Sequence, residues 1–277
     1  MSELFALEWS GGVAEHHFRR ARPDDELPWE SLDARKYSAE LLAAAREVWT
    51  GVALSEYAAI AAFSEVVGAL VAARAPLDLI GMTSDFLADE VYHVELASRL
   101  LMQLGGAAPR TFEPTELAPR TAPGLTPLER ANELALRVGC IAEPFASATA
   151  VPMMRETTHP LVRKVYETIL RDEARHGRFG RLYFDWANDK LNASEKERLG
   201  HVAASALSSY ASLWQRVETA STRELGWTPA DAHELGWIEP SRYAPLARSA
   251  VRDEILPHLA AMGFPVSEDE KRALLGG

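Results

Sequence analysis

The apolar positions of this chain follow the spacing of helices over most of its length. They recur every three or four residues in five long stretches, which is typical of amphipathic helices, and β-branched runs are rare. We predict no strand. The five predicted helices have the approximate bounds 38–74, 77–104, 126–150, 161–189 and 194–220, and shorter helices broken by prolines follow over 221–277.

Turn signals between these stretches indicate how the helices are joined. Ala75-Pro76 separates the first two helices, and the segment 152–160 separates the third and fourth. The long stretch 107–125 contains four prolines and is predicted to cross over from one helix pair to the other. The chain therefore divides into an irregular N-terminal arm (1–36), a four-helix bundle (37–190) and a C-terminal helical extension (191–277).

Two capping boxes are predicted to start helices. The first is Thr126-Pro127-Leu128-Glu129, which also has proline at the first helical position, and the second is Ser194-Glu195-Lys196-Glu197.

Each of the four predicted bundle helices carries one glutamate inside its apolar stripe. An unpaired carboxylate buried there would cost several kcal/mol or take up a proton, so these acids need a partner, and a coordinated metal ion is a natural one. The four residues are Glu56, Glu90, Glu143 and Glu173.

Two of these glutamates begin a Glu-x-x-His sequence, in which both side chains leave the same helix face and can reach one ion. The pairs are Glu90 with His93 and Glu173 with His176. One such motif alone is weak evidence, since Glu156-Thr-Thr-His159 has the same pattern but falls in a predicted turn.

The spacing of the four glutamates supports a common site. Glu56 and Glu90 are 34 residues apart, and their midpoint, residue 73, lies beside the first predicted turn. Glu143 and Glu173 are 30 residues apart, and their midpoint, residue 158, lies inside the second. Because residues equidistant from a hairpin turn lie side by side, each hairpin brings its two glutamates to one level, roughly 22–26 Å from the turn.

With four glutamates and two histidines on four helices, the sequence resembles the ferritin-like di-metal superfamily. That superfamily includes the ribonucleotide reductase small subunit, bacterial multicomponent monooxygenases, arylamine N-oxygenases and ferritins. The resemblance covers about residues 40–188, and the string Asp172-Glu173-Ala174-Arg175-His176 closely matches the superfamily's second motif. It implies an all-α, ferritin-like four-helix bundle with a long crossover and a C-terminal helical extension.

The resemblance also implies the ligands of a di-iron site, with manganese as the alternative metal. One ion would be held mainly by Glu56, Glu90 and His93, and the other mainly by Glu143, Glu173 and His176, with two of the glutamates bridging. The same six residues are expected to support catalysis. Asp89 and Asp172, each directly before a ligand glutamate, resemble the outer acids that hold the opposite histidine.

Composition and charge limit the partners. The net charge of −11 argues against a surface built for nucleic-acid phosphates. Cys140 is the only cysteine, so no intramolecular disulfide forms and we expect a cytoplasmic protein. The sequence begins without a signal peptide pattern, and Ser64 and Glu65 interrupt the most apolar run, so we predict no membrane span. An oligomer is compatible with the sequence.

These observations predict a non-haem di-iron oxidoreductase that activates O2 to oxidise or oxygenate a small organic substrate, with electrons from an external donor or the substrate. A ferritin-like ferroxidase is the runner-up, but this chain continues for some 90 residues beyond the bundle. A di-manganese catalase has the same ligand types. The net negative charge of the chain disfavours a tRNA-modifying hydroxylase. A bundle without metal would leave four buried glutamates unexplained.

Overall fold

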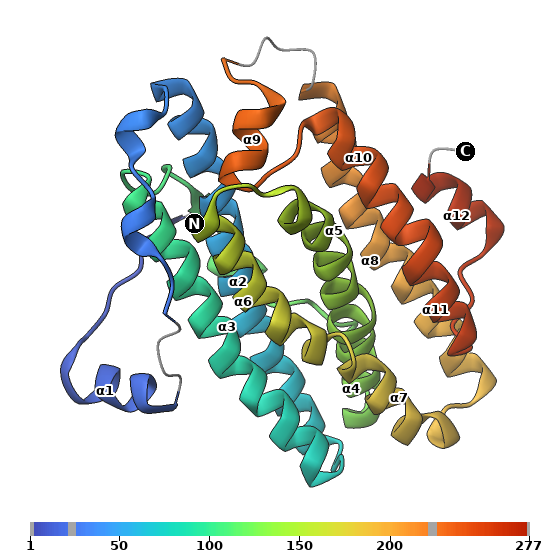
Figure 1. Ribbon diagram of the computed structural model, residues 1–277. Helices are drawn as coiled ribbons and strands as arrows, with labels where there is room; N and C mark the ends of the chain where they lie inside the picture. The colour runs from blue at the N-terminus through green and yellow to red at the C-terminus, as the bar shows by residue number, and fades with distance from the viewer. Residues whose placement is uncertain (1–2, 22–25, 221–225, 276–277) are drawn as a thin grey trace.

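Four long helices form the centre of the molecule in the computed structural model, which describes residues 3–21, 26–220 and 226–275. The helices are α2 (Ala39–Ala72), α3 (Leu77–Gln103), the run from α4 (Pro127–Ala135) to α5 (Glu143–Glu156), and α6 (Pro160–His176). α2 packs against α3 and α4, α5 packs against α6, and α6 packs against α3, as Figure 1 shows. The predicted all-α, ferritin-like four-helix bundle is confirmed.

The C-terminal residues form a second helical layer beside the bundle. It contains α8 (Ala193–Ala220), α9 (Pro229–Leu235), α10 (Pro240–Ser249), α11 (Leu256–Ala261) and α12 (Glu268–Leu275). α8 and α10 run along the side formed by α4 and α5 (Figure 1). One cluster of buried apolar side chains extends from Phe63 in α2 to Leu259 in α11, so this layer shares its core with the bundle.

Helix α9 covers one end of the bundle. The Trp49 indole N–H donates to the carbonyl of Leu235 at 2.9 Å, and the Tyr166 hydroxyl donates to the carbonyl of Gly236 at 2.6 Å. Gly236 has a φ of 99°, and a side chain there would meet Val162 at 2.7 Å, so glycine is required at this close approach.

The N-terminal arm and the crossover differ from the prediction. The arm contains helix α1 (Gly12–Ala21), where we predicted irregular structure, and Arg19 on this helix pairs with Glu95 of α3. A short antiparallel pair of strands, β1 (Glu3–Leu4) and β2 (Thr111–Phe112), joins the arm to the crossover, where we predicted no strand. The extended, proline-rich crossover leaves backbone groups for the arm to pair with.

Two π-helical segments each end just before a proline. They are Leu136–Ala142, which precedes Pro144, and Ala250–Ile255, which precedes Pro257. The N–H of Glu143 donates to the carbonyl five residues earlier, at Val138. Proline has no N–H to continue the α-helical pattern, and the wider turn accommodates this without ending the helix.

Several predicted helix boundaries were wrong. The third bundle helix continues through Pro152 to Glu156, because a proline in the last turn removes only one hydrogen bond. The fourth ends at His176, and α7 (Phe179–Ala187) follows after Gly177. The capping box at Thr126 is confirmed, but α8 begins differently, since the Asn192 side chain accepts the N–H of Glu195 at 2.8 Å.

In the described part of the chain, two helices, Ala39–Ala72 and Pro127–Glu156, are long and apolar enough to cross a membrane by length and composition, a test that core helices of a bundle also pass. Both pack as bundle helices and carry acids into the bundle interior. More than half of the apolar stretch of Pro127–Glu156 is buried in the bundle core, but only 22% of that of Ala39–Ala72.

Gly180 allows α7 to approach the π-helical segment before α5. A Cβ atom at this position would lie 2.5 Å from Cys140 Sγ and 2.6 Å from the Gly139 carbonyl oxygen. We expect Gly180→Ala to lower the free energy of unfolding by about 1–3 kcal/mol through overpacking. Gly81, a helical glycine with no atom within 4 Å of a built Cβ, is the control. Gly81→Ala should raise stability by up to about 1 kcal/mol. Urea titrations of both variants would check this, and equal effects would contradict it.

Candidate metal centre

The six predicted ligands meet in the middle of the bundle. The residues come from α2 (Glu56), α3 (Glu90, His93), the first turn of α5 (Glu143) and α6 (Glu173, His176). The two hairpin turns fall at 73–76 and 157–159, close to the predicted midpoints. The equal spacing of the glutamates from each turn therefore places all four at one level.

The ligand atoms form two overlapping groups in which all atoms lie within 4.8 Å of one another. One group contains Glu56, Glu90, His93 and Glu173, and the other contains Glu90, Glu143, Glu173 and His176. Glu90 and Glu173 belong to both groups, which is the arrangement expected of two bridging carboxylates, and each group contains one histidine.

Most of the candidate ligand side chains are buried, so their charges and polar atoms need a partner such as a cation. The side chains of His93 and His176 are fully buried, that of Glu90 is 1% exposed, and those of Glu143 and Glu173 are each 7% exposed. Among the described residues, the two carboxylate oxygens of Glu90, Oε2 of Glu173, both ring nitrogens of His93 and Nδ1 of His176 have no hydrogen-bond partner. Buried polar atoms left without hydrogen bonds are rare and call for an explanation. Four carboxylates and two imidazoles fit a pair of divalent cations such as iron or manganese.

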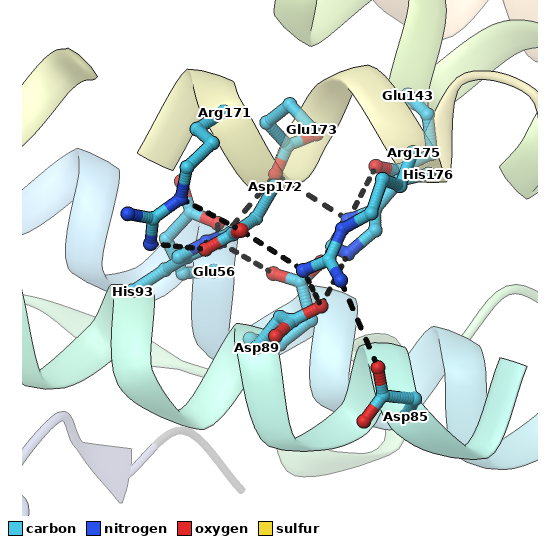
Figure 2. A network of polar contacts seen from close by, with 11 residues as sticks. Glu56, Asp85, Asp89, His93, Glu143, Arg171, Asp172, Glu173, Arg175 and His176 are labelled. Atoms are coloured by element: carbon cyan, nitrogen blue, oxygen red, sulfur yellow. Dashed lines mark hydrogen bonds and ion pairs between the residues drawn. The ribbon is translucent and has the colours of Figure 1, made fainter. Parts of the chain in front are cut away.

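Two outer aspartates lie beside the histidines, as Figure 2 shows. His176 Nε2 lies 3.2 Å from Asp89 Oδ2, and His93 Nε2 lies 3.6 Å from Asp172 Oδ2. Each aspartate follows the pattern that the resemblance implies, because it comes from the helix opposite its histidine. The contact of His176 Nε2 with Asp89 is within hydrogen-bond distance and can hold a proton there, whereas that of His93 Nε2 with Asp172 is longer. Nδ1 of each ring points toward the glutamates.

Crowded carboxylates shift the acid–base properties of the site. Burial and the charge of neighbouring Glu143 raise the pKa of Glu173 to about 8, and burial raises the pKa of Glu143 above its usual range. Burial alone would lower the pKa of His176 and of His93, but the surrounding carboxylates raise both pKa values well above normal. Protons therefore compete with cations for these atoms, and metal binding should release protons.

Asp172 behaves in the opposite way. Burial would raise its pKa, but the neighbouring His93 and Arg171 lower the pKa below the usual range of a carboxyl. This outer acid stays ionised and can hold the imidazole N–H.

The Glu-x-x-His sequence in the turn serves other purposes. Glu156 pairs with Arg242 at the end of α5. The His159 side chain caps α6 by accepting the N–H of Leu161. Neither residue joins the two ligand groups.

This difference between the motifs provides a test. We expect His159→Ala to leave the metal content unchanged, whereas His93→Ala and His176→Ala should each lower it, because each ion loses its imidazole. Elemental analysis after anaerobic Fe(II) loading would measure this. Equal losses in all three variants would mean that the site lies elsewhere.

Sequence reasoning missed two arginines of the polar network. Arg171 contacts Asp172, and Arg175 contacts both Asp89 and Asp172. Both lie on α6 beside the ligands (Figure 2). The signal was present in the string Asp172–His176, which contains Arg175, but an arginine on a helix is usually a solvent-facing charge.

Comparisons with known proteins agree with this geometry. Residues 80–252 match the family model described as p-aminobenzoate N-oxygenase AurF, which is more than half of the chain. A solved structure from Synechococcus, described as a protein with aldehyde deformylating oxidase activity, superposes with a TM-score of 0.57 at 17% sequence identity. The match covers 86% of this chain and 97% of that chain, and it shows the shared fold. No curated protein matches the sequence.

Proposed function

Because this chain belongs to the AurF family of p-aminobenzoate N-oxygenases, we propose that it oxygenates the nitrogen of an aromatic amine at the paired ligand groups of the bundle. Membership of the family makes the protein a non-haem di-iron enzyme that activates O2 and acts on an organic substrate. The predicted class of enzyme and its two-iron cofactor are confirmed at this level.

The observation that carries the proposal is the pair of overlapping ligand groups with buried, unpartnered ligand atoms. Glu90 and Glu173 would bridge two irons, Glu56 and His93 would complete one ligand set, and Glu143 and His176 the other. Once bound, the two ferrous ions supply the electrons and binding positions for reduction of O2. The four carboxylates offset the four positive charges of two ferrous ions, and the neutral imidazoles leave this balance unchanged.

The chain's own residues determine which side of the site is accessible. Glu56 is the most exposed of the six ligands, with 17% of its side chain accessible, whereas both histidine side chains are fully buried. Two apolar neighbours of Glu56 on α2, Val52 and Ile60, are only half-buried. We therefore place the approach of O2 and substrate on the α2 side of the site, opposite the histidines and their aspartates.

An aromatic cluster between α5 and α8 supports an aromatic substrate. The Phe145 ring lies 4.5 Å from the Tyr210 ring and 6.4 Å from the Trp214 ring. Burial, with the negative charge of Glu143, raises the pKa of Tyr210 to about 12. The buried Trp214 indole N–H has no hydrogen-bond partner among the described residues and would suit an acceptor group of the substrate.

As part of the same proposal, a separate protein donates any electrons that the substrate does not supply, and the enzyme acts in the cytoplasm. Buried Cys140 requires no oxidising compartment.

The test is a turnover assay with labelled oxygen. The Fe(II)-loaded protein is incubated with a chemical reductant, isotopically labelled O2 and p-aminobenzoate or another arylamine. We expect a hydroxylamine or nitro product that contains label from O2. The His159→Ala variant should retain this activity, and His176→Ala should lose it.

Other outcomes would favour the alternative functions. Accumulation of iron far beyond two ions per chain, without product, would indicate a ferroxidase. Rapid disproportionation of hydrogen peroxide by the manganese-loaded protein would indicate a catalase. Labelled product from aliphatic amines or alkanes, but not from arylamines, would contradict the substrate class.

A further inference from the structure

One arginine contacts both of the aspartates that hold the histidines. Arg175 Nη2 lies 2.9 Å from Asp172 Oδ1 and 3.0 Å from Asp89 Oδ2. Asp172 precedes it on α6, whereas Asp89 belongs to α3. Figure 2 shows its guanidinium between the two carboxylates, with Asp85 on its outer side at 3.9 Å.

These contacts form a continuous path from one histidine to the other. His93 meets Asp172, Asp172 meets Arg175, Arg175 meets Asp89, and Asp89 meets His176. The two imidazole rings at its ends have centroids 6.0 Å apart. The path lies outside the ligand set, on the α3 and α6 side.

Charge explains why a cation is needed at the centre of this path. Asp89 and Asp172 are buried beside four ligand glutamates, so the region gathers negative charge. A buried carboxylate that loses a nearby cation there is repelled by its acidic neighbours and turns away from the imidazole that it contacts. Arg175 is half-exposed, with 49% of its side chain accessible, so it supplies this charge without full burial of its own.

The shape of the guanidinium adds a second effect. Its planar fork holds several hydrogen-bond acceptors in fixed directions, which the ammonium of a lysine does not do. A group that fixes Asp89 and Asp172 relative to each other also fixes the rings of His176 and His93. The relative orientation of the two histidines then depends on Arg175, with Arg171 as a second contact of Asp172.

We propose that Arg175 is a positioning residue that orients both histidine ligands at once and makes the two ions bind as a pair. This inference rests on the metal site of the proposed function and is independent of the substrate. It concerns Arg175 alone, since the described contacts of Arg171 reach Asp172 and do not reach Asp89.

The test is an anaerobic Mn(II) titration of the metal-depleted full chain, followed by electron paramagnetic resonance. This method distinguishes free ions, single bound ions and spin-coupled pairs. For the wild type we expect two ions per chain, bound as a pair. Arg175→Met, which keeps the length of the side chain without charge or donors, should weaken both positions by about 10–100-fold, the usual cost of losing an outer partner.

Three matched variants separate positioning from general damage. Arg171→Met should weaken chiefly the ion beside His93. Arg175→Lys keeps the charge and should recover part of the affinity, but the ions should bind one after the other. Gly200→Ala lowers stability in the C-terminal layer, where a built Cβ would meet the Pro265 carbonyl oxygen at 2.1 Å, so it should leave the ratio of the two affinities unchanged.

A double-mutant cycle tests whether Arg175 acts through the aspartates. The combined loss in Arg175→Met with Asp89→Asn should be smaller than the sum of the single losses. Wild-type pair binding in Arg175→Met would overturn the inference, as would a loss confined to one position or fully additive losses. If the wild type itself fails to bind two ions, it is the proposed function that fails.

Discussion

Replacing Glu90 with glutamine should prevent both metal ions from binding, whereas replacing Glu56 with glutamine should remove only one. Glu90 offers atoms to both ligand groups, and Glu56 offers atoms to the group that contains His93. Loss of an outer partner typically lowers metal affinity by 10–100-fold, so loss of a direct ligand should lower it by more than about 100-fold. Fe(II) titration with elemental analysis would give about zero ions for Glu90→Gln and about one for Glu56→Gln.

Turnover should be almost completely lost in both variants, although their metal contents differ. Reduction of O2 between two ions requires both, so we expect either variant to lose nearly all turnover even though Glu56→Gln keeps one ion. Glu65, on the solvent side of α2 and paired with Arg130, is the matched control and should tolerate glutamine. Equal metal content in Glu56→Gln and Glu90→Gln would mean that Glu90 does not bridge.

The bundle and the meeting of the six candidate ligands could be predicted because both depend on spacing along single helices. Helical periodicity fixes which face each glutamate occupies, and equal distances from a turn fix its level. Glu156 and His159 show the limit of this reasoning, since they match the motif letter by letter. Only the interruption of the helix at Thr157 separates them from the real pairs.

The remaining features depend on contacts that no local pattern records. Helix α1 is held by Arg19 reaching Glu95 across 76 residues, and the strand pair joins β1 to a crossover more than 100 residues away. Arg175 acts through Asp89 on another helix. The start of α8 was wrong for a related reason, because Asn192 and Ser194 both offer good caps and the chain geometry selects one.

The stability of the metal-free protein should fall as pH rises from about 4.5 toward 8, whereas the stabilisation by metal should grow over the same range. The folded-state pKa of Glu173 is raised from 4.5 to about 8 by burial and by Glu143. A group with a raised folded pKa contributes stability that is complete below its unfolded value and is lost as pH rises through the folded value. His93 and His176 also have raised pKa values, so they act in the same direction above pH 6.5.

Asp172 works against this trend only at low pH. Its lowered pKa contributes stability that is lost as pH falls below its usual value of 3.8, which lies outside the window. The net loss for the metal-free protein between pH 5 and 8 should therefore be on the order of a few kcal/mol, or several degrees in Tm.

Metal reverses the slope because cations bind the deprotonated ligands. Protons compete less as pH rises, and an ion present at a hundredfold excess over its Kd stabilises the folded state by about 2.7 kcal/mol. Thermal melts at pH 5, 6.5 and 8 should show that the Tm values of the metal-free and the Mn(II)-loaded protein diverge as pH rises.

Glu173→Gln removes the main titrating carboxyl, so the Tm of its metal-free form should depend less on pH and should rise little when metal is added. If the metal-free wild type became more stable between pH 5 and 8, the four glutamates would be held by internal hydrogen bonds, and the site would not be built for cations.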